Sequence, residues 1–545
     1  MVWLLRQNSS SGEGGGADGG RRGADREPCL LHENHAYYGA VSDGCADELL
    51  TPSGWGARHT LAVLGCLGFF VAFSLRVNMS MAIVAMVNGT ALRLLSPHND
   101  SAGGGDLLCT GNRTYLIGND LQQDGPFVWS ELTQGVILSS YFGGYLVSQV
   151  PAGRLAERLG AVRVLAVGLA AAGLLTLLTP VCALSGVPAL VTIRFLQGAA
   201  SGVTTPSIHC LLARWVPPNE RSRISTFVYV GKQLGTAVTI LSAGPLAGWR
   251  WAGGWQAIFY VTGSVTLVWS VAWTLLVYET PADHPRISFR ERVYIYSLTY
   301  QGSGQRSSSV PFPWRRALSC RPFQALMVTQ FCQNWGDYLI MTELPTYIST
   351  ALRYPLNTNA MFSALPQLAK VVFALGVSFV ADWLARGSRL SLSANRKLWN
   401  SIGMYIPALT LVGVSFAGCS DVLVLTLMVI TVGFNGAVLS GYNINHMDLA
   451  PNFAGTLMGI TNCVATLAGV LAPFQAGYVL NQQPSLANWR TVFLTAAGLL
   501  ALGNTVFCVL GSTSRQPWNE PTPERCLVLD ADAEVKRRAR QQAVL

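Results

Sequence analysis

Residues 60–87 read TLAVLGCLGFFVAFSLRVNMSMAIVAMV, a predominantly apolar run in which Arg76 is the only charged residue. A helix needs roughly 20 apolar residues to cross the hydrocarbon core of a bilayer, and this run supplies them. Comparable runs recur along the chain as far as residue 512, with short polar breaks between them. The sequence therefore predicts an all-α membrane protein rather than a soluble domain.

The composition of the whole chain agrees with this prediction. Half of the 545 residues are hydrophobic and only 12% are charged, whereas soluble domains usually carry about 25% charged residues. The formal net charge of +9 does not indicate a nucleic-acid partner, because the Lys and Arg residues lie in the breaks between apolar runs rather than on one basic face. We therefore expect a lipid bilayer as the partner and no nucleic acid.

Sequence signals of other protein classes are missing. The twelve cysteines form no CxxC or Cys/His cluster, so the sequence indicates neither a metal site nor a disulfide framework. The segment Gly231-Lys232-Gln233 comes nearest to a nucleotide-binding loop, but it lacks the Ser or Thr of that motif. The apolar runs contain no HExxH or GxSxG pattern. We therefore expect no enzyme, no cofactor and no metal.

Twelve runs are predicted to cross the membrane. They are residues 60–87, 132–152, 163–183, 187–213, 224–248, 254–277, 322–350, 361–383, 399–418, 421–446, 453–480 and 489–512. The longest internal polar stretch, Tyr278–Arg321, separates the sixth run from the seventh and predicts two six-helix halves. The expected organisation is a disordered cytosolic tail (1–55), a first half (56–277) containing loop 88–130, a cytosolic inter-half loop (278–321), a second half (322–512) and a cytosolic C-terminal tail (513–545).

The loops also predict an orientation. Basic residues gather after the even-numbered runs, namely Arg154, Arg158, Arg163, Arg214, Arg221, Arg223, Arg286–Arg321, Arg386, Arg389, Arg396 and Lys397. Because cytoplasmic loops carry the excess of Lys and Arg, both termini are expected to be cytosolic. Loop 88–130 would then be extracellular or lumenal. It carries three glycosylation sequons, at Asn88, Asn99 and Asn112, which agrees with that side of the membrane.

A short motif follows the second run. The segment Gly153–Arg163 reads GRLAERLGAVR and resembles the loop pattern of the major facilitator superfamily, whose members contain twelve helices in two six-helix repeats. The resemblance implies a conformational latch, a contact that holds the two halves together in one state, built from Gly153, Glu157, Arg158 and Arg163. A shortened version of the same pattern occurs in the second half at Asp382 and Arg386. The alternative is that these residues only anchor helix ends on the cytosolic side.

Four further segments resemble one family within that superfamily. They are Gly68–Ser80 in the first run, Tyr141–Gly153 in the second, Trp215–Ser222 after the fourth, and Gly441–Asn462 at the end of the tenth, which reads GYNINHMDLAPNFAGTLMGITN. Together they are similar to the family of sialin, the vesicular glutamate transporters and the sodium/phosphate cotransporters. The resemblance implies a small anionic solute as the substrate, with coupling to protons, sodium or the membrane potential.

Two arginines lie well inside apolar runs. Arg76 and Arg194 each place a guanidinium at bilayer depth. This placement costs a few kcal/mol, so charged residues at that depth are rare and usually functional. A planar guanidinium suits a carboxylate or phosphate, and the resemblance implies that both line the substrate path. Tyr145, Gln333, Asn334 and Asn443 are expected to complete the binding site. The alternative is that the arginines pair with acids such as Asp337 or bond to backbone.

Ion coupling departs from the relatives. Sialin carries two glutamates in the fourth run, where this chain has Gln197 and Ser201, which cannot carry a proton near neutral pH. The remaining candidates for proton coupling within the runs are His209, Asp337 and Glu343. The carboxylates can equally be neutralised by Lys232 or Lys370, and His209 can be a hydrogen-bonded histidine near a helix end.

These observations predict a secondary active transporter of an organic anion or inorganic phosphate that works by alternating access and is coupled to protons, sodium or membrane potential. A transporter-like facilitator, receptor or anion channel that lacks ion coupling is the alternative. We expect a monomer in a lysosomal, vesicular or plasma membrane. Residues 25–31, DREPCLL, resemble the acidic dileucine lysosomal signal of sialin, although Arg26 occupies the usual acidic position.

Overall fold

The computed structural model describes residues 55–88, 125–249, 253–299, 312–350, 352, 356–386, 390–418, 420–482 and 486–519. The predictions for the N-terminal tail, for Asn99 and Asn112 and for the dileucine-like segment lie outside these residues.

The described residues fold into long helices that match the expected runs. The first half contains α2 (Ala57–Met86), α4 (Glu131–Leu159), α5 (Ala161–Ser185), α6 (Val187–Ser201) with α7 (Thr204–Trp215), α8 (Arg221–Ala247) and α9 (Gln256–Leu276). The second half contains α12 (Arg321–Thr350), α13 (Leu356–Arg386), α14 (Leu392–Phe416), α15 (Asp421–Asn435) with α16 (Tyr442–Leu449), α17 (Ala454–Gln482) and α18 (Leu486–Leu510). With α6–α7 and α15–α16 each forming one interrupted traverse, the described residues contain twelve traverses, as predicted.

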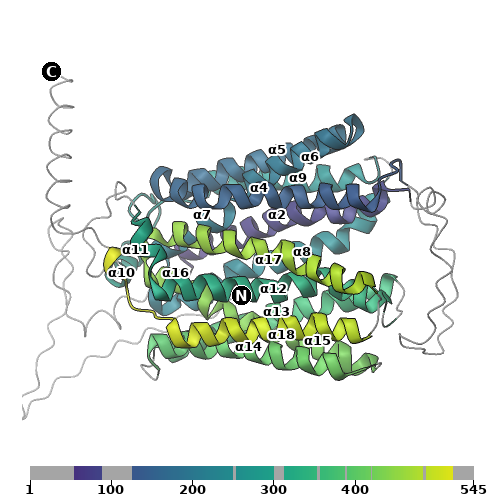
Figure 1. The fold of residues 1–545 in the computed structure, drawn as a ribbon. Coiled ribbons are helices and arrows are strands. Elements are labelled where there is room, and N and C mark those ends of the chain that lie inside the picture. Colours follow the sequence, from purple (N-terminus) through teal and green to yellow (C-terminus); the bar gives the residue numbers. More distant parts are fainter. Residues whose placement is uncertain are drawn as a thin grey trace, which may run out of the picture. The chain divides into compact units, whose positions relative to one another are not determined.

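The helices of each half pack mainly against one another. In Figure 1 the helices of the first half, coloured purple to teal, lie together, and those of the second half, coloured green to yellow, lie beside them. Helix α2 packs on α8 and α4 on α6 in the first half, while α12 packs on α17 and α18 in the second. Two long contacts join the halves, α4 against α17 and α8 against α13. Helix α7 adds a contact with α17, so these five helices form most of the inter-half surface of the described residues.

Eight helical segments of the described chain are long and apolar enough to cross a membrane by themselves. Helices α4, α8 and α12 are long but do not meet this criterion, and α6 and α7 are only 15 and 12 residues long. Three of these helices, α4, α7 and α8, make extensive contacts with the opposite half. Their polar residues are tolerated because part of each surface faces protein rather than lipid.

Helices α4 and α6 approach each other backbone to backbone. A Cβ atom added at Gly144 would lie 1.9 Å from the carbonyl oxygen of Phe195, and one added at Gly198 would lie 1.9 Å from that of Tyr141. Only glycine fits at such a distance, and small residues are the usual means of close helix packing in membranes. This contact fixes the rotation of α6, the helix that carries Arg194.

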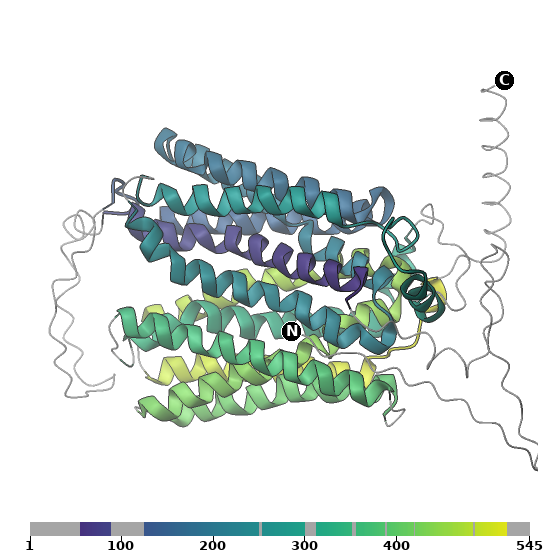
Figure 2. The same ribbon diagram turned by 180° about the vertical axis from the view of Figure 1, so that it is seen from behind.

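The Arg-rich loops lie at one end of the helices, here called the basic end, where Figures 1 and 2 place α10 (Phe289–Thr299) and α11 (Trp314–Leu318). The stretch Tyr278–Arg321, predicted as a loop, therefore contains two short helices. Helix α10 is held there because its Glu291 accepts hydrogen bonds from the free backbone N–H groups of Ala57 and Arg58 at the start of α2.

The first residues of the predicted C-terminal tail are also ordered against the basic end. The backbone N–H of Gln516 donates to the carbonyl oxygen of Leu449, and Asn519 accepts from the backbone N–H of Asn452. The tail therefore leaves the bundle from beside the segment that links α16 to α17.

Candidate functional site

Arg76 lies between the halves. Its guanidinium donates to the hydroxyl of Tyr338 in the second half. Its central carbon lies 4.5 Å from the ring centroid of Phe142 and 5.4 Å from those of Phe73 and Tyr145. No carboxylate of the described residues pairs with Arg76, and its Nε has no hydrogen-bond partner there. Aromatic faces stabilise the cation, but an acceptor for the remaining N–H groups is missing.

Arg194 is buried more deeply and stays within the first half. One guanidinium nitrogen donates to Oε1 of Gln197 at 2.9 Å and to the carbonyl oxygen of Leu75 at 3.5 Å, and the group lies over the Tyr141 ring at 4.7 Å. Gln197 therefore holds Arg194 in place. Neither arginine pairs with Asp337 in the described structure.

Asp337 has a different partner. The ammonium of Lys370 on α13 lies 3.0 and 3.1 Å from its two carboxylate oxygens. The Lys370 side chain is only 6% exposed, whereas that of Asp337 is 39% exposed. In this conformation the Asp337 carboxylate is therefore neutralised by a lysine, as one of the two alternatives from the sequence had it, and the lysine is Lys370 rather than Lys232. The sequence named both lysines as candidate partners, but it could not show which of them lies on a helix face that meets Asp337.

Of the polar residues expected to complete the binding site, Tyr145 is bonded to the opposite half, whereas Gln333 and Asn334 form no such bond among the described residues. Tyr145 and Gln149 of α4 both bond to the side-chain amide of Asn462 on α17, so Tyr145 lies on the inter-half surface. Gln333 is buried and neither polar atom of its side chain has a partner among the described residues. Asn334 donates to the carbonyl oxygen of Gln330, one turn earlier.

Asn443 lies near the candidate His209. The hydroxyl of Tyr229 lies beside the Asn443 side chain and is 2.8 Å from Nδ1 of His209. The His209 ring meets the ring of His446, which belongs to the other half, at a centroid distance of 5.5 Å. His209 is therefore a buried contact between the halves, a role that its position near a helix end did not reveal.

Glu343, the third coupling candidate, lies further along α12. Its carboxylate accepts from the hydroxyl of the adjacent Thr342 at 3.3 Å, and no cation of the described residues forms an ion pair with it. Glu343 is thus separate from the groups that surround Arg76.

The predicted latch residues lie at the basic end, where they join the halves. Glu157 of α4 accepts from the backbone N–H and the hydroxyl of Thr456 on the second half, both at 2.7 Å. A Cβ atom at Gly153 would lie 2.6 Å from the carbonyl oxygen of Gly455, so glycine is needed there. Asp382 of α13 accepts from the backbone N–H groups of Ser222 and Arg223 at the start of α8, a helix terminus that favours an anion.

The exposed side chains of two other members of the predicted latch, Arg158 and Arg163, form no ion pair with the described residues of the second half. Arg154, which was not part of the predicted latch, pairs with Glu157 and lies 5.9 Å from the ring centroid of Phe453 in the second half. The side chain of Arg386 lies outside the described residues. Arginines beyond a helix end can point to solvent, so a motif cannot tell which of several arginines forms the contact.

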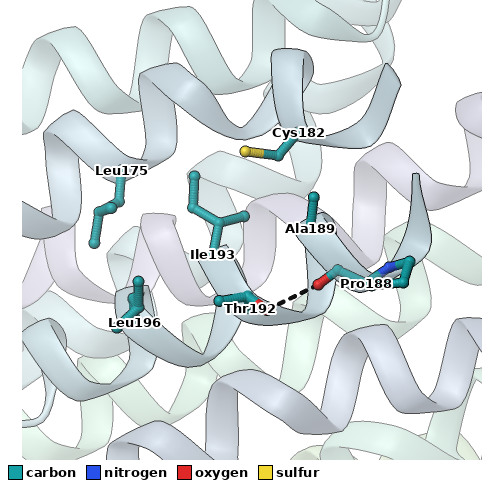
Figure 3. Close-up of a pocket in the computed structure, with 7 residues that line it drawn as sticks. All are labelled: Leu175, Cys182, Pro188, Ala189, Thr192, Ile193 and Leu196. Carbon is teal, nitrogen blue, oxygen red and sulfur yellow. Dashed lines mark hydrogen bonds between the residues drawn. The ribbon is translucent and has the colours of Figure 1, made fainter. Parts of the chain in front are cut away.

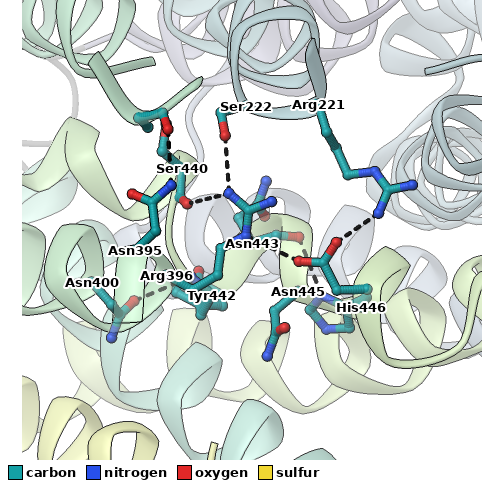
Figure 4. Close-up of polar contacts among 12 residues, drawn as sticks. Arg221, Ser222, Asn395, Arg396, Asn400, Ser440, Tyr442, Asn443, Asn445 and His446 are labelled. Atoms are coloured by element: carbon teal, nitrogen blue, oxygen red, sulfur yellow. Dashed lines mark hydrogen bonds and ion pairs between the residues drawn. The ribbon is translucent and has the colours of Figure 1, made fainter. Parts of the chain in front are cut away.

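The contact at the centre of the predicted latch was not predicted from the sequence, although both of its ends, Arg221 and Asp448, lie in the quoted family segments. Arg221 and Arg396, which are labelled in Figure 4, both donate to the carboxylate of Asp448. Arg221 belongs to the first half and lies 2.6 Å from Asp448, while Arg396 belongs to the second half and lies 3.0 Å away. Arg396 also donates to the hydroxyl of Ser222. The halves are therefore closed together at the basic end.

A separate groove lies on the side of the first half (Figure 3). It has a volume of about 460 Å³ and is formed by residues of α5 and α6, namely Leu175, Cys182, Pro188, Ala189, Thr192, Ile193 and Leu196. The Thr192 hydroxyl is already bonded to the carbonyl oxygen of Pro188. With no charged group in its lining, the groove does not suit an anion.

Comparisons with known proteins agree with this geometry. Residues 64–473 match the Major Facilitator Superfamily profile. The chain is 41% identical to a Drosophila melanogaster protein named "Putative inorganic phosphate cotransporter", covering 86% of this chain and 87% of that one. It is 35% identical to human sialin (85% and 90% covered) and 33% identical to Xenopus laevis vesicular glutamate transporter 1 (87% and 79% covered).

A solved structure shares the fold. The proton:xylose symporter XylE, bound to 6-bromo-6-deoxy-D-glucose, superposes with a TM-score of 0.58 at 14% identity, covering 85% of this chain and 98% of that one. At this identity the likeness concerns the arrangement of the helices alone.

Proposed function

The chain belongs to the major facilitator superfamily, in the family that includes sialin and the vesicular glutamate transporters, and from this premise we propose how it handles its substrate. It is a multi-pass membrane protein and a secondary transporter of anions, not an enzyme. The substrate that we propose is a small organic anion or inorganic phosphate, taken up between the halves and released by alternating access.

The observation that carries the proposed binding site is the environment of Arg76. Its charge is held between the halves by aromatic rings and one hydroxyl, with no acidic partner among the described residues. An entering carboxylate or phosphate would accept hydrogen bonds from the remaining N–H groups of Arg76 in the bidentate geometry that a guanidinium favours. Gln333, whose amide atoms are buried without partners, would orient the substrate with Tyr145, Asn334 and Asn443.

Arg194 has a supporting role in this proposal. Its bonds to Gln197 and to backbone leave fewer free N–H groups than Arg76 has. We propose that it contributes positive potential from behind Tyr141, over whose ring it lies. Direct binding would first require release of Gln197.

The cycle would alternate between the closed basic end and a state in which that end opens. Opening must break the Arg221–Asp448 ion pair, the Glu157–Thr456 bonds and the bonds of Asp382 to the start of α8. All are hydrogen bonds to a charged group, which are stronger than neutral ones. They would hold the closed state until substrate and coupling ion shift the balance.

For coupling we propose protons, carried by Asp337, with sodium or membrane potential as the alternatives. Protonation of Asp337 would free Lys370 and remove a negative charge close to the entering anion. Glu343 and His209 are the other candidate carriers. We further propose a glycosylated monomer with cytosolic termini in a lysosomal, vesicular or plasma membrane, because the basic loops share one end of the bundle and the sequon at Asn88 follows the opposite end of α2.

The test is uptake by purified protein in proteoliposomes. Radiolabelled phosphate, succinate and glutamate are offered with imposed pH, sodium and electrical gradients. Arg76→Ala is expected to lower uptake at least about tenfold, the effect of losing one charge-assisted bond. Arg315→Ala removes an exposed arginine of α11 and should have no effect. Wild-type uptake by Arg76→Ala contradicts the binding site, and uptake that follows no gradient supports an uncoupled facilitator.

A further inference from the structure

Lys232 is a second cation without a counter-ion among the described residues. Its ammonium lies 4.5 Å from the ring centroid of Tyr229, 4.6 Å from that of Phe69 and 5.5 Å from that of Phe73. No carboxylate of the described residues forms an ion pair with it, and the side chain is not fully buried. The aromatic faces stabilise the ammonium and leave its N–H groups available.

Lys232 and Arg76 share an aromatic neighbour. The centroid of the Phe73 ring lies 5.4 Å from the Arg76 guanidinium and 5.5 Å from the Lys232 ammonium. On the opposite half, Tyr338 contacts Arg76, and the preceding residue, Asp337, is close enough to Lys232 to act on it electrostatically. Arg76, Lys232, Lys370 and Asp337 therefore form one group of charges that spans both halves.

The charges of this group do not cancel. Three cations, Arg76, Lys232 and Lys370, face a single carboxylate, Asp337, whose two oxygens are both occupied by Lys370. An uncompensated charge removed from water is costly and is normally paired. A bound substrate with one negative charge would neutralise Arg76 and leave Lys232 unpaired, whereas a substrate with two would neutralise both.

We propose that Lys232 is a substrate ligand and that the site prefers a doubly charged anion, one acidic group bound by Arg76 and Tyr338 and the other by Lys232. This inference rests on the proposed function. Lys370 keeps Asp337 neutralised, so that the carboxylate does not repel the second acidic group. A lysine ammonium is a compact donor of three hydrogen bonds that binds carboxylate, sulfate or phosphate oxygens equally. Dicarboxylates and tetrahedral dianions are therefore both in the substrate class.

The test compares anions of the same shape that differ by one charge. Succinate and its half-amide succinamate form one pair, and sulfate and methyl sulfate form the other. Each competes against uptake of radiolabelled phosphate in proteoliposomes at pH 7, and each is also assayed for thermal stabilisation of the purified protein. The wild-type protein should prefer the dianion of each pair at least about tenfold, because one charge-assisted bond is lost with the monoanion.

Two variants of Lys232 carry the test. Lys232→Met keeps the length and the contacts with the rings but removes the charge, and it should lower dianion affinity to that of the monoanion while leaving monoanion binding within about twofold. Lys232→Arg should retain the preference for dianions. Lys397→Met, a lysine of α14 that takes no part in the group, is the control and should behave as wild type.

The outcomes separate the two proposals. If wild-type protein transports anions but monoanions compete as well as dianions, or if Lys232→Met keeps the tenfold preference, Lys232 is not a ligand while the proposed function stands. If the wild-type protein neither binds nor transports any of these anions, the proposed function is wrong. Restored preference in Lys232→Arg distinguishes loss of the charge in Lys232→Met from loss of folding.

Discussion

Replacing Asp448 by Asn should open the basic end of the protein. Asp448 accepts hydrogen bonds from Arg221 of the first half and Arg396 of the second. Because Arg396 and Asp448 belong to the same half, their contact can persist when the halves separate. Of the two contacts of Asp448, only the one with Arg221 joins the halves, so only this contact of Asp448 is confined to the closed state.

The size of the effect follows from that single bond. A hydrogen bond to a charged group contributes about 1.5–3 kcal/mol, and 1.4 kcal/mol corresponds to a factor of about ten in an equilibrium constant. An Asn at position 448 keeps the shape but not the charge. The closed state should therefore lose a factor of about 10 to 150 relative to the open state. Since both arginines lose a buried counter-ion, overall stability should also fall, by about 3–5 kcal/mol.

Cys210 provides the assay. It is a buried cysteine of α7 that forms no disulfide among the described residues, and a Cβ atom added at Gly455 of the opposite half would lie 3.2 Å from its Cβ. Its alkylation by N-ethylmaleimide, followed by mass spectrometry of the Cys210 peptide in folded protein, should accelerate at least about tenfold in Asp448→Asn. Asp283→Asn removes an exposed carboxylate near the same end and serves as the control. Unchanged alkylation in folded Asp448→Asn would refute the latch.

Three further predictions concern packing, topology and coupling. Gly144→Val should lower the free energy of unfolding by about 1–3 kcal/mol or more, and with it the melting temperature, since its Cβ would meet the carbonyl of Phe195. Gly143→Ala is the control and should be nearly neutral, because the nearest neighbour of its Cβ would be 3.6 Å away. Glycosidase treatment should increase gel mobility until all three sequons of loop 88–130 are replaced, and cytosolic access to that loop would contradict the orientation. Asp337→Asn should retain counterflow exchange but lose pH-driven accumulation of the substrate. Full accumulation by the folded variant would exclude Asp337 as the proton carrier. Loss of protein stability without loss of coupling would favour a structural pair with Lys370.

Much of the candidate site was visible in the sequence because a charge at bilayer depth is conspicuous there. Arg76, Arg194, Asp337, Lys232 and Lys370 all lie inside apolar runs. Sequence alone left open which charges pair, because all five lie on different helices or at different depths. The Asp337–Lys370 pair depends on the rotation of α12 against α13, and that rotation is set by packing along their whole lengths.

The latch divides in the same way. The Gly and Glu of the motif at 153–163 contact the second half, whereas Arg158 and Arg163 are exposed in this conformation. Glycine spacing and helix ends are local properties, so a motif can reveal them. The direction of a long side chain beyond a helix end depends on which acceptor the other half presents.

The sequence by itself determined that the chain is helical, that it crosses a membrane and where its helices run. Lipid cannot satisfy backbone N–H and C=O groups, so each apolar run of sufficient length must form its own hydrogen bonds as a helix. The tertiary structure alone decided that Arg221 meets Asp448, that His209 meets His446 and that Lys232 has no ion-pair partner in the described part of the chain. These contacts join residues far apart in the chain, and no local rule of backbone geometry or hydropathy brings such residues together.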